Sequence, residues 1–245
     1  MPTYREAANL RLLLPGVAEA MKPTHLSYEV LVMDDASDDD PAAAVRAAAG
    51  ICPAELIVRP GPRDLSLAVL DGLRRARGHI LLVMDADLSH PPEKIPDLLA
   101  ALGQGQTDFV IGARFVPGGG TEDWGGHRRF NTFVASLLCR PLVGGIRDPM
   151  AGFFALRRET FLRAEGLNPI GYKIGLELIC RCRCRQVVEV PITFHNRRSG
   201  QSKLDLEQQR RYLLHLGRLY RDCRPGWGLL VRPLLWAMRG ILRIL

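Results

Sequence analysis

Apolar residues in the first half of the chain fall into short continuous runs separated by amphipathic stretches. The runs rich in branched residues predict strands at Tyr28–Met33, Glu55–Arg59, His79–Met84 and Asp108–Gly112. The stretches around them predict helices at Glu6–Met21, Pro41–Ala49, Leu65–Arg77 and Pro92–Leu102. Continuous rather than alternating apolar runs are typical of strands covered on both faces. This alternation predicts an α/β fold with a mostly parallel sheet.

The pattern changes after Gly112. A glycine loop at Pro117–Gly120 comes first. The elements predicted after it are a helix near Arg128–Leu142, a strand near Gly152–Leu156, a helix near Lys173–Arg185, a strand at Val187–Phe194 and a long helix near Leu204–Arg221. We therefore expect one domain over residues 1–222 and a C-terminal tail over residues 223–245. Met1–Glu6 is interpreted as a loop, and the strand that usually precedes such a loop is expected to be missing.

The composition is that of a globular chain with a basic C-terminal segment. The 245 residues are 47% hydrophobic and 24% charged, which excludes global disorder. The formal net charge is +7; from Arg197 onward eleven basic and three acidic residues give +8, which leaves −1 for the rest. This segment is expected to have an anionic partner, such as phosphate, nucleic acid or an acidic membrane.

The six cysteines and the lack of a long apolar run indicate the cellular compartment of the protein. Without a signal-peptide pattern, the cysteines predict reduced thiols and a cytoplasmic protein. The Cys180-x-Cys182-x-Cys184 run has no second ligand pair at zinc-site spacing, so buried thiols beside solvated arginines are the favoured interpretation. No window of about 20 apolar residues is present, so no transmembrane helix is expected.

Two acidic clusters each follow a predicted strand. Residues 34–40 read Asp-Asp-Ala-Ser-Asp-Asp-Asp, and residues 85–90 read Asp-Ala-Asp-Leu-Ser-His. In open α/β sheets, ligands bind beyond the carboxyl ends of the strands. Aspartates two residues apart can share one hard cation, and Mg²⁺ favours one or two carboxylates together with phosphate oxygens. One such turn is better explained by helix capping, but two after consecutive apolar strands favour a metal and phosphate site.

Basic residues that could bind phosphate gather in the second half of the chain. They are Arg114, Arg128, Arg129, Lys173, Arg197, Arg198 and Lys203. Arginine suits bidentate phosphate recognition, and lysine supplies a point charge. A solvated basic face also explains Arg129 and Arg198, but explains Arg114 less well because it directly follows an apolar strand. Carboxylates and cations together indicate a site for a diphosphate leaving group or a phosphate acceptor.

Five motifs occur in order along residues 2–222. They are Pro2-Thr3-Tyr4-x-Glu6, Asp34-Asp35-x-Ser37-x-Asp39, Asp85-Ala86-Asp87-Leu88-x-His90-Pro91-Pro92-Glu93, Asp148-Pro149-x-x-Gly152-Phe153 and Gly200-x-Ser202-Lys203. Together they resemble the family 2 glycosyltransferases, and specifically the polyprenol-phosphate (dolichol-phosphate) mannosyltransferases. The resemblance implies a GT-A fold, which is a Rossmann-like, nucleotide-sugar-binding α/β fold of three layers. It also implies inverting transfer of mannose from GDP-mannose to a polyprenol phosphate.

The resemblance also implies roles for individual residues. The sugar nucleotide would be bound by Pro2, Tyr4, Glu6, Asp35, Asp85, Ala86, Asp87, Lys173, Arg197, Ser202 and Lys203. The acceptor phosphate would be bound by Arg114, Arg128 and Thr132. Asp85 and Asp87, with Ser89 as a further candidate, would hold Mg²⁺ or Mn²⁺. Asp87 and Arg114 would be the catalytic residues.

Several positions depart from the family pattern. The family usually has Gln at Ser89, Gly at Ala36 and commonly Glu at Gln201, and residues 59–66 lack its Lys-Gly-Leu-Gly pattern. Two alternatives therefore stay open: a related transferase that uses a UDP-sugar, such as a prenyl-phosphate glucosyltransferase, and a catalytically impaired membrane-bound subunit. Nucleic-acid binding is disfavoured because the chain has no recognition motif and no interleaved aromatic residues.

The tail predicts a helix that lies on a membrane surface. Arg232, Arg239 and Arg243 are spaced to share one stripe, and apolar residues cover much of the remainder. Trp227 and Trp236 suit an interface. From Pro233 about 12 residues remain, roughly 18 Å of helix, which is too short for a hydrocarbon core of about 30 Å. We predict peripheral binding to the cytoplasmic leaflet, with packing on the protein itself or on another subunit as the alternative.

Overall fold

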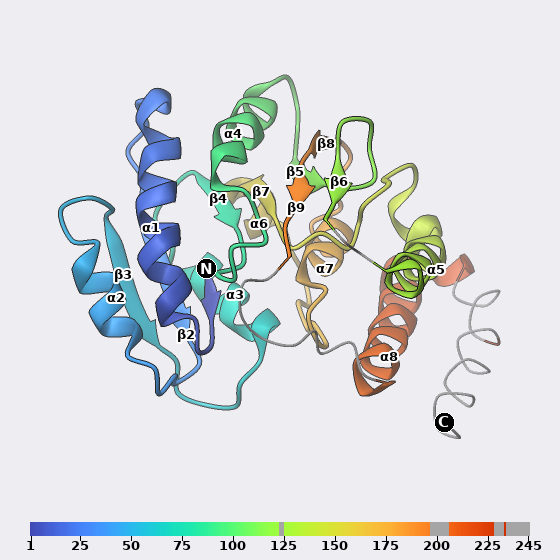
Figure 1. Cartoon of the computed structure of the whole chain (residues 1–245). Helices are drawn as coiled ribbons and strands as arrows, with labels where there is room; N and C mark the ends of the chain where they lie inside the picture. The colour runs from blue at the N-terminus through green and yellow to red at the C-terminus, as the bar shows by residue number, and fades with distance from the viewer. Residues whose placement is uncertain (123–124, 197–205, 228–232, 234–245) are drawn as a thin grey trace.

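The computed structural model describes residues 1–122, 125–196, 206–227 and 233 (Figure 1). The strands are β1 (Pro2–Thr3), β2 (Val30–Asp34), β3 (Ala54–Val58), β4 (Ile80–Val83), β5 (Phe109–Ala113), β6 (Gly120–Thr121), β7 (Phe154–Arg157), β8 (Val187–Pro191) and β9 (Thr193–Phe194). The helices are α1 (Ala7–Met21), α2 (Pro41–Ala47), α3 (Leu65–Arg75), α4 (Ile95–Gly103), α5 (Gly126–Val143), α6 (Arg158–Leu162), α7 (Ile174–Arg181) and α8 (Leu206–Cys223), with 3-10 turns at Lys22–Thr24 and Pro92–Lys94.

Helices cover both faces of the strands, as the continuous apolar runs predict. One core cluster joins α1, α2 and α4 to one face of the strands, through residues such as Leu10, Leu98 and Val110. A second cluster joins α3, α6 and α7 to the opposite face, through residues such as Leu70 and Phe154. The predicted α/β fold of three layers is therefore confirmed.

The first sheet is parallel and has the order β1-β2-β3. Its first strand corrects the sequence-based expectation, because Pro2–Thr3 is not a loop but a short strand beside the end of β2. The Met33 N–H donates to the Met1 carbonyl at 2.8 Å, and the Asp35 N–H donates to the Thr3 carbonyl at 3.0 Å. Even so short a strand therefore satisfies main-chain donors where the acidic turn begins.

The second sheet is mixed and has the order β4-β7-β5-β8. β5 and β8 are parallel, whereas β7 runs antiparallel to both β4 and β5. Phe154, the first residue of β7, pairs with Val83 near the end of β4 and with Ile111 of β5. This reversal brings the segment that enters β7, which includes Asp148 and Gly152, to the edge where β4 and β5 end.

Helix α8 is attached to α5 and α7 by a third core cluster. Leu213, Leu216 and Leu219 are buried there. The hydroxyls of Tyr212 and Tyr220 donate to the α5 carbonyls of residues 135 and 138, each at 2.6 Å. In the part of the chain that the structure describes, no helix is long and apolar enough to cross a membrane.

Two predicted boundaries in the second half are wrong. The helix expected over Lys173–Arg185 ends at Arg181, because Arg183 has a left-handed φ of 53° and the Cys184 N–H turns back to the Ile179 carbonyl at 3.1 Å. The single strand expected over Val187–Phe194 is divided into β8, which pairs with β5, and β9, which pairs with β6.

Candidate active site

The turn after β4 presents two aspartates of unequal exposure. The Asp85 side chain keeps 25% of its surface exposed, whereas Asp87 is 4% exposed. Buried Ser89 donates its main-chain N–H at 3.1 Å and its hydroxyl at 2.5 Å to Asp87 Oδ1. Ser89 therefore orients Asp87 through one carboxylate oxygen. Ala86 lies between the two aspartates and packs into the core.

His90 holds the main chain of this turn in place. The Asp85 N–H donates to His90 Nδ1 at 3.0 Å, so a neutral His90 ring carries its proton on Nε2. The ring is buried, stacks on Phe153 with centroids 5.2 Å apart and meets Phe194 edge-on at 5.5 Å. His90 thus fixes the position of the Asp85 main chain rather than acting as a base toward a substrate.

Gly152 leaves room for the Asp85 carboxylate. A Cβ atom at this position would lie 3.3 Å from Asp85 Oδ2 and 3.4 Å from His90 Cε1. The contact with Asp85 is tighter than an ordinary van der Waals contact, and the contact with His90 is at its lower limit. The glycine of the Asp148-Pro149-x-x-Gly152 motif is therefore explained by close approach to the acidic turn.

Arg114 is held beyond the end of β5 by Asp148. Arg114 Nε and Nη2 each donate to the Asp148 carboxylate at 2.7 Å, and the Arg114 main-chain N–H donates at 2.8 Å. Asp148 has no exposed surface and Arg114 has 8%. This buried bidentate pair fixes the plane of the guanidinium. The role of Arg114 toward an acceptor phosphate stays a prediction.

Glu189 holds the main chain that carries Asp148. It lies on β8 opposite Ile111 of β5. Glu189 Oε1 accepts the N–H groups of Arg147 at 3.0 Å and Asp148 at 2.7 Å. Because Asp148 in turn fixes Arg114, Glu189 is a positioning residue for that guanidinium.

Replacing Glu189 with Ala is expected to raise, by on the order of tenfold, the KM of the phosphate acceptor that the resemblance implies, because it removes the hydrogen bonds that Glu189 accepts from the main chain carrying Asp148. The KM of the sugar nucleotide should change little. Steady-state kinetics with each substrate varied in turn measure both constants. Glu189→Gln keeps an acceptor oxygen and should restore most of the affinity, and Glu55→Ala on exposed β3 is the matched control. Equal acceptor KM in Glu189→Ala and the wild type contradicts the positioning role.

Lys173 lies in the same electrostatic cluster as Arg114 and Asp85. Its Nζ donates to the Met150 carbonyl at 3.3 Å and lies 4.3 Å from the centroid of the Tyr172 ring. Burial and the positive charge of Arg114 lower the pKa of Lys173 to about 7, although Asp148 and Asp85 oppose the shift. A negatively charged group bound next to Lys173 would therefore stabilise its ammonium form.

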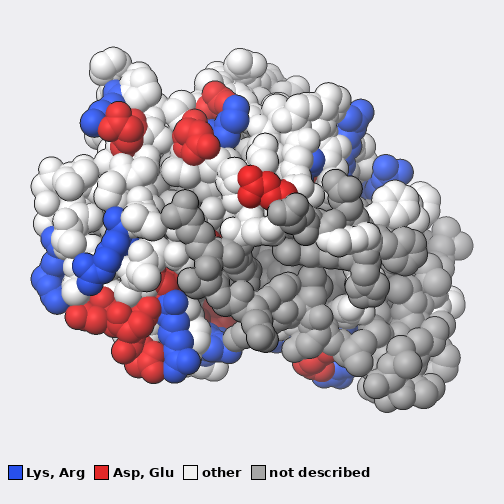
Figure 2. All heavy atoms as spheres, in the orientation of Figure 1, with Lys and Arg blue, Asp and Glu red and all other residues white. Residues whose placement is uncertain are grey.

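Most of the first acidic cluster has a structural role. Asp34 accepts the Ser37 N–H at 2.8 Å, and Asp39 accepts the Ala7 N–H at the start of α1 at 2.8 Å. Asp40 caps α2, and Asp38 forms an exposed ion pair with Arg5. Figure 2 shows acidic and basic side chains gathered together at the lower left of the molecule. For these four aspartates, turn and cap formation explains the sequence better than ligand binding.

Asp35 differs from its neighbours because it is buried against a charged loop. Its carboxylate accepts hydrogen bonds from the Arg59 guanidinium and, at 3.0 Å, from the Asp64 N–H. Arg59 also binds Asp71 at 2.9 Å. The loop 59–65, where the family pattern is absent, is thus tied to Asp35 by charge. Arg63 lies over the Tyr4 ring, 4.1 Å from its centroid.

The remaining predicted residues fall into three groups. Pro2 is buried in β1, and Glu6 accepts the Asn9 amide at 2.5 Å at the start of α1, so both lie near the ends of β1 and β2 with Tyr4 and Asp35. Thr132 is half-buried on α5, where the structure describes Arg128 only as part of the helix backbone. Arg197, Ser202 and Lys203 lie outside the described residues.

The sequence matches a known family. The model of Glycosyl transferase family 2 matches residues 1–163, which contain β1 to β7 and both acidic turns. This chain belongs to glycosyltransferase family 2. The predicted resemblance and the predicted enzyme class are therefore confirmed.

Relatives of this family 2 glycosyltransferase are named dolichol-phosphate mannosyltransferase or polyprenol monophosphomannose synthase. The dolichol-phosphate mannosyltransferase of Pyrococcus furiosus is 40% identical over 224 residues, which are 90% of this chain and 62% of that protein. The dolichol-phosphate mannosyltransferase of Mycosarcoma maydis is 39% identical over 230 residues, or 90% of this chain and 78% of the relative. The polyprenol monophosphomannose synthase of Mycolicibacterium smegmatis is 35% identical over 254 aligned positions, gaps included, which cover 99% of this chain and 90% of that protein. The chain thus spans 62% of the length of the Pyrococcus relative.

Solved structures share the fold of this family 2 chain. Mannosyl-3-phosphoglycerate synthase from Rubrobacter xylanophilus has a TM-score of 0.69 and 21% identity, over 90% of this chain and 72% of that chain. Glucosyl-3-phosphoglycerate synthase from Mycobacterium tuberculosis has a TM-score of 0.63 and 21% identity, over 91% and 77%. At this identity the similarity shows the fold alone, and it agrees with the predicted GT-A type.

The donor set of the acidic turn fits a hard divalent cation. Asp85 and Asp87 offer carboxylate oxygens, and the Asp85 side chain keeps 25% of its surface exposed. Among the described residues no three acidic, histidine or cysteine side chains form a complete metal site. A cation bound by Asp85 and Asp87 would therefore complete its coordination with substrate oxygens and water, as Mg²⁺ commonly does.

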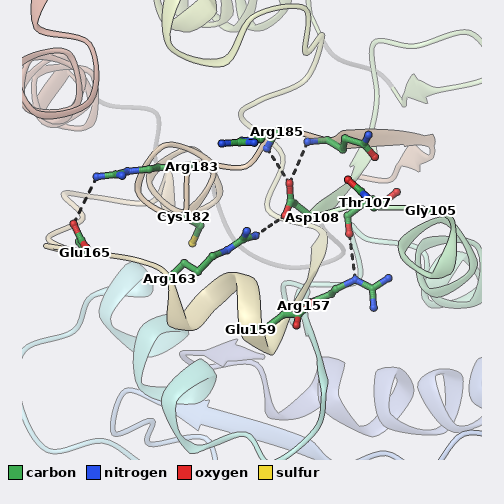
Figure 3. Close-up of a pocket in the computed structure, with 12 residues that line it drawn as sticks. Gly105, Thr107, Asp108, Arg157, Glu159, Arg163, Glu165, Cys182, Arg183 and Arg185 are labelled. Atoms are coloured by element: carbon green, nitrogen blue, oxygen red, sulfur yellow. Dashed lines mark hydrogen bonds and ion pairs between the residues drawn. The ribbon is translucent and has the colours of Figure 1, made fainter.

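A separate cavity lies at the opposite ends of β5 and β8 (Figure 3). Its volume is about 1030 Å³, and arginines line much of it. Arg163 pairs with Asp108, which also accepts the N–H groups of Arg185 and Gln186 at 2.9 and 3.2 Å. Arg157 donates to two main-chain carbonyls, one of them near the end of α4 at 2.9 Å. These arginines hold loops together, so the cavity is not the candidate active site.

Proposed function

We propose that this family 2 glycosyltransferase moves a mannosyl group from GDP-mannose onto a polyprenol phosphate, with inversion at the anomeric carbon. The observation that carries the proposal is the meeting of two cations, Arg114 and Lys173, with the Asp85–Asp87 turn at one edge of the sheet. A cation pair beside metal-binding carboxylates suits two phosphate groups, one on each substrate. The names of the relatives support the sugar and the lipid carrier.

The acceptor chemistry requires no strong base. A phosphate monoester has a second pKa of about 6, so at neutral pH it is largely a dianion and already a nucleophile. One of its oxygens attacks the anomeric carbon while the bond to the nucleoside diphosphate breaks. This agrees with the arrangement of His90, whose Nδ1 accepts from the main chain of the turn.

Positioning and charge neutralisation would supply the catalysis. Arg114, fixed by Asp148, would orient the acceptor phosphate toward the sugar. Lys173 would stabilise negative charge on the departing diphosphate, with help from Arg197 and Lys203 if the family roles hold. Asp85 and Asp87 would hold a divalent cation, Mg²⁺ or Mn²⁺, which neutralises diphosphate oxygens when bound.

The decisive assay measures transfer of radiolabel from GDP-mannose to polyprenol phosphate by the full chain, with and without a divalent cation. We expect a lipid-soluble product that forms only when the cation is present. UDP-glucose is tested in parallel as the donor. A lipid product from UDP-glucose alone would assign the chain to the glucosyltransferase alternative, and no product from either donor would favour the impaired subunit.

The pH dependence of donor binding should follow Lys173. Its pKa of about 7 means that the ammonium is charged below neutral pH and loses its charge as the pH rises through that value. The KM for the sugar nucleotide is therefore expected to increase above about pH 7. In Lys173→Arg the group stays charged, so the rise should be absent. The test is the donor KM of both proteins measured from about pH 6 to 8.5. Parallel curves would contradict the role of Lys173 in donor binding.

We further propose that the acceptor is reached from a membrane surface. Phe133 is 61% exposed and Leu137 is 49% exposed, and their spacing puts them on one face of α5, the helix that carries Arg128 and Thr132. Trp227, at the start of the basic tail, is 50% exposed. Exposed apolar side chains close to the predicted acceptor residues suit a lipid substrate. Residues 234–245 of the tail lie outside the described residues.

Removal of the tail is expected to abolish binding to anionic liposomes. The full chain should sediment with anionic vesicles and less with neutral ones, because its arginines are attracted to anionic lipid. A chain ending at Arg224 should stay in the supernatant. The full chain with Arg232, Arg239 and Arg243 changed to Gln separates charge from apolar burial. Equal sedimentation of the full and shortened chains would refute a membrane role for the tail.

A further inference from the structure

Two cysteines that the proposed reaction does not use meet where α7 and α8 end. Cys180 is in the last turn of α7, and Cys223 is the last residue of α8. Both are half-buried and pack against the core cluster that joins the two helices. Their thiols lie close enough to interact with each other. The pair therefore combines contact between two sulfurs with access from solvent.

Ion pairs on the neighbouring residues hold the two helix ends in this arrangement. Arg181, next to Cys180, donates to the carboxylate of Asp222, next to Cys223, at 2.8 Å. Arg181 also donates to Glu177 at 3.1 Å, and Glu177 binds His215 of α8 at 2.6 Å. These two links hold the ends of α7 and α8 together beside the thiols.

We propose that Cys180 and Cys223 form a reversible disulfide in reaction with a small-molecule disulfide, and that this bond is a redox modification site that ties α8 to α7. In a reducing compartment the dithiol is the resting state. The tail predicted to bind membranes begins at residue 223, so the bond fixes the first residue of that tail to the catalytic domain.

The reaction proceeds by two exchanges. The Cys223 thiolate attacks one sulfur of the oxidant RSSR, which forms a mixed disulfide and releases RS⁻. The Cys180 sulfur then attacks the Cys223 sulfur, and its proton goes to the second RS⁻ that leaves. In total the two cysteine thiols lose two electrons and two protons, and one RSSR becomes two RSH.

The surroundings favour Cys223 as the attacking sulfur. The interaction with the Cys180 thiol and the positive charge of Arg181 lower the pKa of Cys223, although burial opposes the shift. The interaction with Cys223 and burial raise the pKa of Cys180. A thiolate attacks disulfides, so the pair has one reactive and one resolving cysteine.

The other cysteines are poorer candidates. Cys139 and Cys182 are buried, at 0% and 1% exposure, and burial raises the pKa of Cys139 to about 12. The hydrogen bond with Cys182 and burial raise the pKa of Cys184. We therefore expect oxidation to be specific to one pair, although Cys182 and Cys184 also touch.

Oxidation of the full folded chain with oxidised glutathione tests the proposal. The wild type is expected to lose two of its six thiols, and peptide mapping by mass spectrometry should find Cys180 joined to Cys223. Cys223→Ser should lose none, and Cys180→Ser should keep glutathione bound to Cys223. The double variant Cys182→Ser and Cys184→Ser is the matched control and should oxidise like the wild type. Dithiothreitol should reverse each change.

The effect on the fold has its own measurement. Oxidation is expected to raise the melting temperature of the wild type, and the rise should be absent in Cys223→Ser. Loss of no thiols in the wild type, or a bridge between Cys182 and Cys184, overturns the proposal. Transfer activity of the reduced Cys180→Ser and Cys223→Ser variants should equal that of the wild type.

Discussion

Replacing Asp87 with Asn is expected to lower kcat by about 10²-fold or more while the protein stays folded. A metal ion that neutralises a departing diphosphate contributes several kcal/mol to the transition state, and each 1.4 kcal/mol is about a tenfold change in rate. Asn keeps the oxygen that accepts both hydrogen bonds from Ser89, so only the charge is removed. The measurement is single-turnover transfer over a range of Mg²⁺ and Mn²⁺ concentrations.

Asp97→Asn is the matched control for this experiment. Its carboxylate is half-exposed on α4 and pairs only locally, with Lys94 at 2.8 Å, so transfer should be normal. The melting temperatures of the two variants should be similar. Near-normal turnover of Asp87→Asn at low metal concentration would contradict the metal assignment, because a cation held by both aspartates should bind more weakly when one carboxylate is lost.

The elements of the fold were largely predictable from the sequence, but the direction of one strand was not. Apolar runs predicted β2, β3, β4 and β5 within a few residues, both for β5, which is buried at every position, and for β3, which keeps Glu55 and Val58 exposed. The same pattern predicts a strand near residues 152–156, but it does not say which strands this strand pairs with or in which direction it runs. The antiparallel position of β7 between β4 and β5 is a long-range choice. That choice is what brings Asp148 to Arg114.

The two acidic turns led to the same prediction. Both follow apolar strands, and the sequence predicted a ligand for both. In the structure Asp34, Asp39 and Asp40 accept main-chain N–H groups at helix starts and in the turn. Aspartate caps helices and binds cations through the same short carboxylate, so residue type alone does not separate these uses. Their partners do: Asp39 and Asp40 accept the N–H groups at the starts of α1 and α2, whereas the helical turn that follows residues 85–90 has no side-chain cap.

Charged residues inside apolar strands were the signal that sequence reasoning missed. Glu189 interrupts the run Val-Val-Glu-Val-Pro of β8, and its partners are the main-chain N–H groups of a segment 41 residues earlier. Arg59 follows β3 and is 7% exposed because two aspartates surround it. A charge that is buried needs a partner, so each such residue predicts an ion pair or hydrogen bonds even where the partner is unknown.

The largest combined effect on stability and activity is expected at the pair Arg114–Asp148. Arg114→Gln leaves the fully buried Asp148 without its partner, and Asp148→Asn leaves the guanidinium without its counter-charge. Breaking a buried ion pair from one side typically costs about 3–5 kcal/mol. Each single variant should therefore show a lower free energy of unfolding in urea, measured by circular dichroism.

The double variant Arg114→Gln with Asp148→Asn separates the structural role of this pair from its catalytic one. With both charges removed no unpaired ion is buried, so most of the lost stability should return. Transfer to polyprenol phosphate should nevertheless stay low, and the KM for the lipid phosphate should rise more than the KM for the sugar nucleotide. Asp148→Asn alone keeps Arg114 and should retain more activity than the double variant. If activity returns together with stability in the double variant, Arg114 serves only to hold the segment before β7, and the acceptor phosphate must be bound by other residues, with Arg128 and Lys173 the next to test.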